Sequence, residues 1–286
     1  MPLEIVRDPR ELRLRVEDAR RDGRRIALVP TMGYLHDGHV ALLAEGRRRA
    51  DLLVLSIFVN PTQFGPNEDL ARYPRDLDGD LAHARAAGVD LVFVPEVAAM
   101  YPDGYQTYIS VRGLEQGLCG ASRPGHFAGV ASVVAKLFHL AQPHVAVFGE
   151  KDYQQLAVLR RMVRDLDFHI ELVGVPIVRE LDGLARSSRN AYLSTSERVD
   201  ALSLVRALGR AEALVRGGEC DTGRLAAAAR EVLAGAASAR VDYVELRDAE
   251  TLETVARIER PTVLALAVFV GKTRLIDNRV LTTTSI

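Results

Sequence analysis

Residues 26–39 read IALVPTMGYLHDGH, and the architecture can be worked out from this stretch. Its first five residues are apolar except for proline, which predicts a strand buried on both faces of a sheet. The chain then turns past Gly33 and Gly38, and a helical pattern follows from Gly38 to about Ala50. A buried strand that leads through a glycine-containing turn into a helix is the first half of a strand–helix–strand unit with parallel strands.

The same alternation continues on the C-terminal side of this stretch. Nearly continuous apolar runs predict four more strands, and helical patterns lie between them. The predicted strands are Leu52–Asn60, Asp90–Pro95, His144–Gly149 and Ile170–Val178; the predicted helices are Asp76–Ala87, Gly129–Ala141 and Tyr153–Leu166. The fold class that follows is α/β, a Rossmann-like, doubly wound parallel sheet whose ligands bind beyond the carboxyl ends of the strands.

The pattern changes after residue 178, where two helices precede three β-patterned runs. The helices are predicted at Glu197–Gly217 and Thr222–Ala237, and the strands at Val241–Arg247, Thr262–Val270 and Thr273–Val280. Gly271 and Lys272 separate the last two strands and predict a hairpin turn. We therefore expect a catalytic domain over residues 1–178 and a smaller α+β domain over residues 179–286, which closes over the active site.

Composition excludes several classes of protein. The 286 residues include 37 basic and 38 acidic side chains, a net charge of −1, whereas a sequence-indifferent nucleic-acid binder needs a large cationic surplus. No apolar stretch approaches the ~20 residues that span a bilayer, and the charged N-terminus does not resemble a signal peptide. Cys119 and Cys220 are too few and too far apart for a disulfide framework. We expect no nucleic-acid or membrane partner, and a cytoplasmic location.

The turn over residues 33–39 has the features of an anion site. Its glycines allow the backbone to approach a ligand closely, and the start of the next helix directs free N–H groups and a positive dipole at an anion. His36 and His39 are three residues apart at that helix start, so both rings can face the same phosphates. Histidine pairs are often only structural, but this position favours a functional role.

Polar residues also follow the second predicted strand. Asn60 and Gln63 carry amides that both donate and accept hydrogen bonds, which suits an uncharged polar group of a substrate. The alternative is a loop that caps its own backbone. A phosphorylated substrate would favour lysine or arginine at these positions.

Lysine is rare in this chain, which makes each one informative. Only Lys136, Lys151 and Lys272 occur beside 34 arginines. Lys151 lies between Glu150 and Asp152, directly after the fourth predicted strand and at a helix start where a phosphate can bind. The alternatives are a solvated charge cluster and chance survival of a lysine in an arginine-rich chain.

The boundary between the two predicted domains contains a second phosphate-binding pattern. Ser187 and Ser188 lie between Arg186 and Arg189. Two hydroxyl groups flanked by two guanidinium groups suit phosphate oxygens, because a guanidinium group can engage two oxygens at once.

Five segments of the chain carry recognisable motifs: TMGYLHDGH (31–39), SIFVNPTQFG (56–65) with DLARYPR (69–75), RPGHFAGVASVV (123–134), FGEKDYQQL (148–156) and DGLARSSRNAYLS (182–194). Together they resemble the pantothenate synthetase (pantoate–β-alanine ligase) family, in the family's order and over about residues 25–195. His-x-Gly-His alone is shared across nucleotidylyltransferases and class I aminoacyl-tRNA synthetases, so the combination is what makes the resemblance specific. Arg186 departs from the family pattern, which more often has an apolar residue there.

The resemblance implies an enzyme that joins pantoate to β-alanine through a pantoyl adenylate, with ATP and Mg²⁺, releasing AMP and pyrophosphate. His39 is then the proton donor, while His36, Lys151 and Arg189 neutralise phosphate charge. The residues that the resemblance places around ATP are Met32, Gly33, Tyr34, Leu35, His36, Asp37, Gly38, His39, Gly149, Glu150, Lys151, Asp152, Val178, Arg186, Ser187, Ser188 and Arg189.

The resemblance also implies the remaining ligand contacts. Pantoate is expected at Asn60, Gln63 and Gln155, and β-alanine beside Gln63. Arg123 and His126 are further candidates on the substrate side. No residue spacing resembles a metal cage, so we expect Mg²⁺ to arrive with the triphosphate. The family also implies a homodimer formed by the N-terminal domains.

Two other functions share part of this pattern. A phosphate-accepting nucleotidylyltransferase has the same fold and the His-x-Gly-His motif, but the pair Asn60 and Gln63 favours a neutral hydroxyacid over a phosphorylated acceptor. A non-catalytic nucleotide-sensing module is expected to have lost some of the histidines, Lys151 or the serine–arginine set, and this sequence retains them all.

Overall fold

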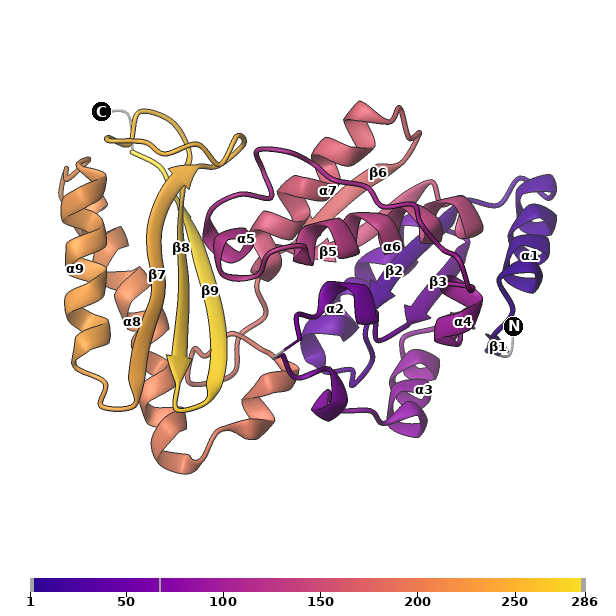
Figure 1. The fold of residues 1–286 in the computed structure, drawn as a ribbon, viewed down its shortest axis with the longest axis horizontal. Helices are drawn as coiled ribbons and strands as arrows, with labels where there is room; N and C mark the ends of the chain where they lie inside the picture. Colours follow the sequence, from indigo (N-terminus) through magenta and orange to yellow (C-terminus); the bar gives the residue numbers. More distant parts are fainter. Residues whose placement is uncertain (1–2, 67, 284–286) are drawn as a thin grey trace. The chain divides into compact units, whose positions relative to one another are not determined.

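The structure, a computed structural model, describes residues 3–66 and 68–283 and divides into two compact units (Figure 1). The first unit contains the described residues up to Glu115, together with Arg123–Glu150 and Val158–Pro176. The second contains Gln116–Ser122, Lys151–Ala157 and the described residues from Ile177 onwards. Two short segments from the first part of the sequence therefore belong to the second unit.

The first unit is built on a six-stranded parallel sheet, which confirms the predicted fold class. The strand order is β1-β4-β3-β2-β5-β6, so the order reverses between the neighbours β2 and β5. The loops that leave these two strands begin at this switch point, where doubly wound sheets bind their ligands. The strands are β1 (Glu4–Val6), β2 (Ile26–Thr31), β3 (Leu52–Ile57), β4 (Leu91–Phe93), β5 (Val145–Gly149) and β6 (Glu171–Val175).

Both faces of this sheet are covered by helices. Alternate residues of the central strands, such as Val29, Leu55 and Val147, pack with α2 and α3. Residues of the opposite parity, such as Leu28 and Val54, are equally buried on the other face, which α1 and α6 cover. The helices are α1 (Pro9–Arg21), α2 (Asp37–Arg49), α3 (Leu77–Ala86), α4 (Val97–Met100), α6 (His126–Ala141) and α7 (Tyr153–Asp165), with short 3₁₀ turns η1 (Pro61–Gln63), η2 (Leu70–Arg72) and η3 (Glu150–Asp152).

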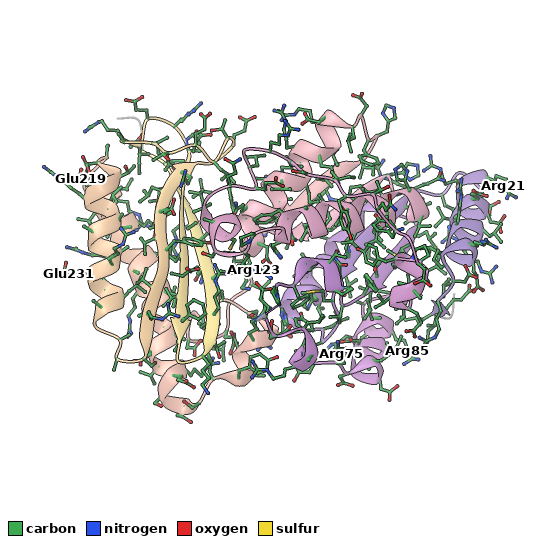
Figure 2. The ribbon with its side chains drawn as sticks, viewed as in Figure 1. Arg21, Arg75, Arg85, Arg123, Glu219 and Glu231 are labelled. Carbon is green, nitrogen blue, oxygen red and sulfur yellow. The ribbon has the colours of Figure 1, made fainter. Side chains whose placement is uncertain are left out.

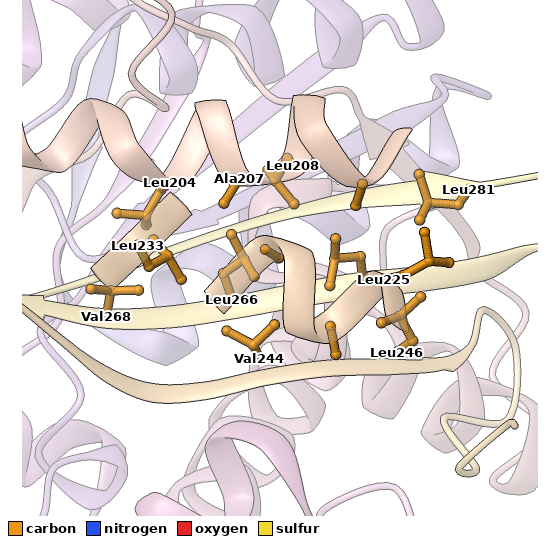
Figure 3. Close-up of a cluster of buried hydrophobic side chains, with 14 of the residues drawn as sticks. Leu204, Ala207, Leu208, Leu225, Leu233, Val244, Leu246, Leu266, Val268 and Leu281 are labelled. Atoms are coloured by element: carbon orange, nitrogen blue, oxygen red, sulfur yellow. The ribbon is translucent and has the colours of Figure 1, made fainter. Parts of the chain in front are cut away.

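The second unit has the predicted α+β composition. Its antiparallel sheet has the order β7-β8-β9, and the pair Val270–Thr273 closes the hairpin at Gly271 and Lys272 as expected. Leucine, valine and alanine side chains from α8, α9 and one face of this sheet form its core (Figure 3). The elements are α5 (Leu118–Ser122), η4 (Ser188–Tyr192), α8 (Thr195–Arg216), α9 (Thr222–Ala234), β7 (Ala239–Asp248), β8 (Thr262–Val270) and β9 (Thr273–Leu281).

The N-terminal elements β1 and α1 were not predicted, although α1 carries recognisable signals. Asp8 caps the helix and Pro9 occupies its first turn. Leu12, Val16 and Ala19 recur at helical spacing and are buried. Charged residues fill the remaining surface of α1, including Arg21 at its end (Figure 2). None of the helices in the described residues is long and apolar enough to cross a membrane.

Candidate active site

The loop from β2 to α2 has an unusual backbone. Gly33 and Tyr34 are consecutive left-handed residues, with φ of 81° and 52°. Glycine adopts this conformation freely, but it costs an ordinary residue such as tyrosine about 1 kcal/mol or more. A Cβ atom on Gly33 would lie only 2.8 Å from Oδ2 of Asp80 and 3.0 Å from a methyl carbon of Ile57. The loop therefore needs glycine at position 33 and an external anchor at position 34.

Asp80 of α3 supplies that anchor. Its Oδ2 accepts the backbone N–H of Tyr34 at 2.9 Å, and its Oδ1 accepts that of Leu35 at 2.6 Å. The side chain is buried, with 3% of the residue exposed. Burial raises the pKa of Asp80 above its ordinary value, although the two backbone N–H groups partly oppose this shift. Sequence reasoning missed Asp80, because no local signal reveals that a carboxylate 46 residues away reaches this loop.

The two histidines lie where they were predicted and are held by the helix start itself. The Nδ1 of His36 accepts the backbone N–H of Gly38 at 3.1 Å, and the Nδ1 of His39 accepts the backbone N–H of His36 at 3.3 Å. The rings are neighbours, with centroids 4.1 Å apart. Because each Nδ1 acts as an acceptor, the proton of each neutral ring is carried on Nε2. This tautomer presents donors of the kind that phosphate oxygens require.

Arg123 and His126 hold the backbone of the second predicted loop. The carbonyl of Gln63 accepts from Nδ1 of His126 at 2.7 Å and from Nη2 of Arg123 at 3.2 Å. The Arg123 guanidinium, labelled in Figure 2, also forms a bidentate pair with Glu68, with both distances 2.6 Å. Burial alone would raise the pKa of Glu68, but the hydrogen bonds and charge of Arg123 hold it below its ordinary value. In this geometry both residues support Gln63.

The loop that carries Lys151 belongs to the second unit and is anchored by neutral amides. Nδ2 of Asn278 on β9 donates to the carbonyl of Lys151 at 2.9 Å. The side chain of Gln154 accepts the backbone N–H of Cys119 at 2.9 Å and donates to the carbonyl of Gly117 at 3.1 Å. The Lys151 side chain is half-buried, and within the described part of the chain its ammonium forms no ion pair. Sequence reasoning missed the roles of Asn278 and Gln154, because their partners lie on other segments of the chain.

Residues 178–186 form a tight hairpin in the second unit. The carbonyl of Val178 accepts the backbone N–H of Arg186 at 2.9 Å. Arg179 forms a bidentate pair with buried Asp277 at 2.7 and 2.9 Å, which fixes the hairpin to β9. The Arg186 guanidinium lies 3.4 Å from Glu180. This departure from the family pattern therefore has a local carboxylate partner.

The serine–arginine set lies at the start of η4. Oγ of Ser187 accepts the backbone N–H of Arg189 at 3.3 Å and caps this short turn. Ser188 is buried, and Arg189 is half-buried. Lys151 and this set belong to the same unit, and β9 supports the segments that carry them. Asn278 of β9 binds the Lys151 segment, and Asp277 of β9 binds the hairpin 178–186, which leads to the serine–arginine set.

The structure thus brings the predicted residues together in two groups. The first unit contains the predicted residues of the loop after β2, Gly149 and Glu150 at the end of β5, and Asn60 and Gln63 after β3. The second unit holds Lys151, Asp152, Gln155, Val178 and the segment 186–189. Whether the two groups surround one ligand stays a prediction.

Metal-ligating side chains do not gather in the described residues. Histidine, cysteine, aspartate and glutamate form no group of three or more that could hold a metal ion there.

The four other histidines are not among the predicted site residues. His83, His139 and His169 are exposed, and Nδ1 of His144 accepts the backbone N–H of Ile26.

Comparisons with known proteins show the family of this chain. The pantoate–β-alanine ligase family model matches residues 4–280. The chain belongs to this family. It is 61% identical to pantothenate synthetase of Anaeromyxobacter dehalogenans over 282 residues, which cover 96% of this chain and 97% of that protein. The predicted family is thereby confirmed, and its members are ligases.

Solved structures of this family share the fold along almost the whole chain. The crystal structure of pantothenate synthetase from Thermus thermophilus is 48% identical and superposes with a TM-score of 0.92, covering 96% of this chain and 98% of the other. Pantoate–β-alanine ligase from Francisella tularensis, complexed with beta-gamma ATP and β-alanine, is 30% identical with a TM-score of 0.80 and 97% coverage of both chains.

Proposed function

We propose that this enzyme condenses pantoate with β-alanine to give pantothenate, using ATP and passing through a pantoyl adenylate. The observation that carries the proposal is the neighbouring pair His36 and His39 at the start of α2, in a loop held by Asp80, in a chain of the pantoate–β-alanine ligase family. Family membership supports the substrates, and the loop geometry supports the phosphate chemistry.

In the first half-reaction, a carboxylate oxygen of pantoate attacks the α-phosphorus of ATP while the bond to the β-phosphate breaks and pyrophosphate leaves. This step needs in-line placement and neutralisation of oxygen charge more than covalent chemistry. The Nε2–H groups of His36 and His39 are suited to donate to phosphate oxygens, with His39 as the proton donor. Lys151, Ser187, Ser188 and Arg189 supply further cationic and hydroxyl donors from the second unit.

In the second half-reaction, the amine of β-alanine attacks the acyl carbon of the adenylate, AMP leaves, and the amine loses a proton. The mixed anhydride reacts with water, so the enzyme must exclude water between the two steps. Gln63 in the first unit and Gln155 in the second are our proposed contacts to pantoate. Asn60, which we expected to contact pantoate as well, is 1% exposed and donates to Gln63, so in this proposal it supports that contact from beneath. Gln63 is also placed beside β-alanine in this proposal.

Mg²⁺ enters this proposal as part of the MgATP substrate. The described residues contain no cluster of three ligating side chains, so this part of the chain offers no cage of that kind. A triphosphate-bound Mg²⁺ that keeps most of its water ligands suits such a site, and it neutralises part of the phosphate charge.

Isotope exchange tests the proposed order of steps. With pantoate and MgATP, the enzyme is expected to exchange labelled pyrophosphate into ATP without β-alanine, and to form pantothenate once β-alanine is added. Exchange that requires β-alanine contradicts a separate adenylation step. A protein that forms no pantothenate with all three substrates contradicts the function itself.

Three further features of the proposal concern the protein as a whole. We propose a homodimer, for which light scattering at micromolar concentration is expected to give twice the 31.3 kDa of the chain. A cytoplasmic location is consistent with two free cysteines, Cys119 and Cys220.

We also propose that residues 1–178 form the catalytic domain that binds nucleotide and pantoate, and that residues 179–286 form a smaller α+β domain of the same enzyme.

A further inference from the structure

A buried amide lies beneath the proposed pantoate contact. Asn60 follows β3 and is 1% exposed. Its Oδ1 accepts three hydrogen bonds: from the hydroxyl of Tyr101 at 2.7 Å, from Oγ1 of Thr62 at 3.0 Å, and from the backbone N–H of Thr62 at 3.4 Å. Its Nδ2 donates to the carbonyl of Gly129 at 3.2 Å and to Oε1 of Gln63 at 3.1 Å.

The direction of these hydrogen bonds is fixed by backbone groups. A backbone N–H can only donate and a carbonyl can only accept, so Thr62 and Gly129 allow one orientation of the Asn60 amide. Nδ2 of Asn60 then requires an acceptor from Gln63, which turns Oε1 of Gln63 inward. The other end of the Gln63 amide, Nε2, lies 3.1 Å from the sulfur of Met32. A thioether is a weak acceptor, so this N–H can be exchanged for a ligand oxygen at little cost.

Tyr101 is held in place by its surroundings. Its ring packs against Phe58 and edge-on against Tyr105, with centroids 6.2 and 5.0 Å away. The ammonium of Lys136 lies 5.7 Å from the centroid of Tyr101 and 4.6 Å from that of Tyr105. Burial raises the pKa of Tyr101 to about 12, so its hydroxyl keeps its proton and remains a donor at neutral pH.

We propose that Tyr101 is a positioning residue: its hydroxyl holds the Asn60 amide in place, and Asn60 in turn directs Nε2 of Gln63 toward the substrate. In that orientation Gln63 donates to an oxygen of pantoate, a hydroxyl or carboxylate. Its Oε1 faces Asn60, so although β-alanine is proposed to lie beside Gln63, Gln63 does not accept from the ammonium of β-alanine. This inference rests on the proposed function and specifies how Gln63 recognises its ligand.

The close approach of α6 supports the same arrangement. A Cβ atom on Gly129 would collide with the backbone carbonyl of Thr62. Glycine at position 129 therefore lets the turn η1 lie against α6, where the Gly129 carbonyl can accept from Asn60. The close contact with Thr62 thus explains why residue 129 is a glycine, which sequence alone did not show.

A double-mutant cycle tests the role of Tyr101. Tyr101→Phe is expected to raise the KM for pantoate about 2- to 12-fold, as loss of one net hydrogen bond of about 0.5–1.5 kcal/mol implies, and to leave the KM for ATP unchanged. In a Gln63→Met background, Tyr101→Phe is expected to add no further change, because the group that it orients is absent. The matched control is Tyr105→Phe, since in the described residues the hydroxyl of Tyr105 makes no hydrogen bond.

Each result of the cycle is informative. An equal effect of Tyr101→Phe in both backgrounds, or an effect no larger than that of Tyr105→Phe, overturns the positioning role. Where Gln63→Met turns over too slowly, calorimetric titration with pantoate gives the same comparison as a dissociation constant. Wild-type protein that forms no pantothenate contradicts the proposed function, which is a different outcome from a failed cycle.

Gln63→Glu tests which substrate Gln63 contacts. The carboxylate can still accept from Asn60 but cannot donate to pantoate, so the KM for pantoate is expected to rise while that for β-alanine changes little. A lower KM for β-alanine would show that position 63 binds the ammonium group, and would overturn the assignment.

Discussion

The two units hold their proposed phosphate-binding loops by different chemistry. In the first unit, the ionisable carboxyl group of Asp80 accepts two backbone N–H groups of the β2 loop. In the second, neutral amides hold the segment that carries Lys151: Asn278 donates to the carbonyl of Lys151, and Gln154, which lies in this segment, donates to the carbonyl of Gly117. A buried carboxylate gives strong, charge-assisted hydrogen bonds but responds to pH, whereas an amide gives weaker bonds that do not. The comparison predicts that the first loop is the more sensitive of the two to substitution of its anchor and to acid.

The largest effect is expected at Lys151 itself, which carries the charge that the neutral anchors position. Removing one preorganised donor from a water-poor site typically costs ~10²–10³ in rate. Lys151→Ala is therefore expected to slow adenylate formation by about that factor, measured as pyrophosphate exchange, with a smaller effect on amide formation from preformed adenylate. Lys272→Ala, at the exposed hairpin turn, is the matched control. Near-normal exchange in Lys151→Ala would remove this lysine from the site.

Asp80→Asn tests the charged anchor. The amide replaces one accepting oxygen by an NH₂ group that faces a backbone N–H, so the loop that carries His36 and His39 loses one of its two anchors. Small displacements of catalytic groups cost on the order of 10² in rate, and we expect adenylation to fall by about this factor. The control is Asp76→Asn on the exposed N-cap of the same helix, which is expected to retain its rate. Equal rates in the two variants would contradict the anchoring role.

Asn278→Ala tests the neutral anchor and is expected to have a smaller effect. One neutral hydrogen bond contributes about 0.5–1.5 kcal/mol net, so adenylation is expected to slow about 2- to 12-fold. The control is Arg279→Ala, since Arg279 pairs with Glu212 of α8 and does not bind the Lys151 segment. A loss in Asn278→Ala as large as in Asp80→Asn would remove the distinction between the two anchors.

The smallest effect is expected from pH, and its sign follows from the raised pKa of Asp80. The folded protein binds this proton more tightly than the unfolded chain does. Between the ordinary pKa and the raised one, the free energy of unfolding therefore decreases as pH rises. Adenylation has the opposite trend, because protonation at low pH removes an acceptor from the loop. Asp80→Asn is expected to abolish this component of both pH profiles, measured by urea unfolding and by pyrophosphate exchange.

Much of the fold could be predicted because its signals are local. Apolar runs marked five of the six strands of the parallel sheet, since buried parallel strands need no alternation of polar residues. The strand Thr262–Val270 was predicted with its observed ends. The elements that were not predicted include β1, which has only three residues, the short helices α4 and α5, and α1, which has few apolar residues although its N-terminus is capped.

The sequence by itself also determined the local positions of the residues that we propose for the chemistry. His36 and His39 were assigned to a helix start because a strand, a glycine turn and a helix follow one another along the chain, and the structure confirms that place. Lys151 was likewise chosen from its position directly after a predicted strand, and Asn60 from its position at the end of one. Such assignments succeed because the end of a strand and the start of a helix are set by neighbouring residues.

Only the tertiary structure decided what holds those residues in place. Asp80, Tyr101 and Asn278 lie 46, 41 and 127 residues from the groups to which they are hydrogen-bonded. Their side chains gain partners only when separate elements pack together, and no periodicity or spacing in the chain encodes such a pairing. The chemical groups of this enzyme are therefore local in sequence, whereas their orientation depends on buried polar contacts between distant segments, because a buried donor or acceptor must find a partner wherever the fold supplies one.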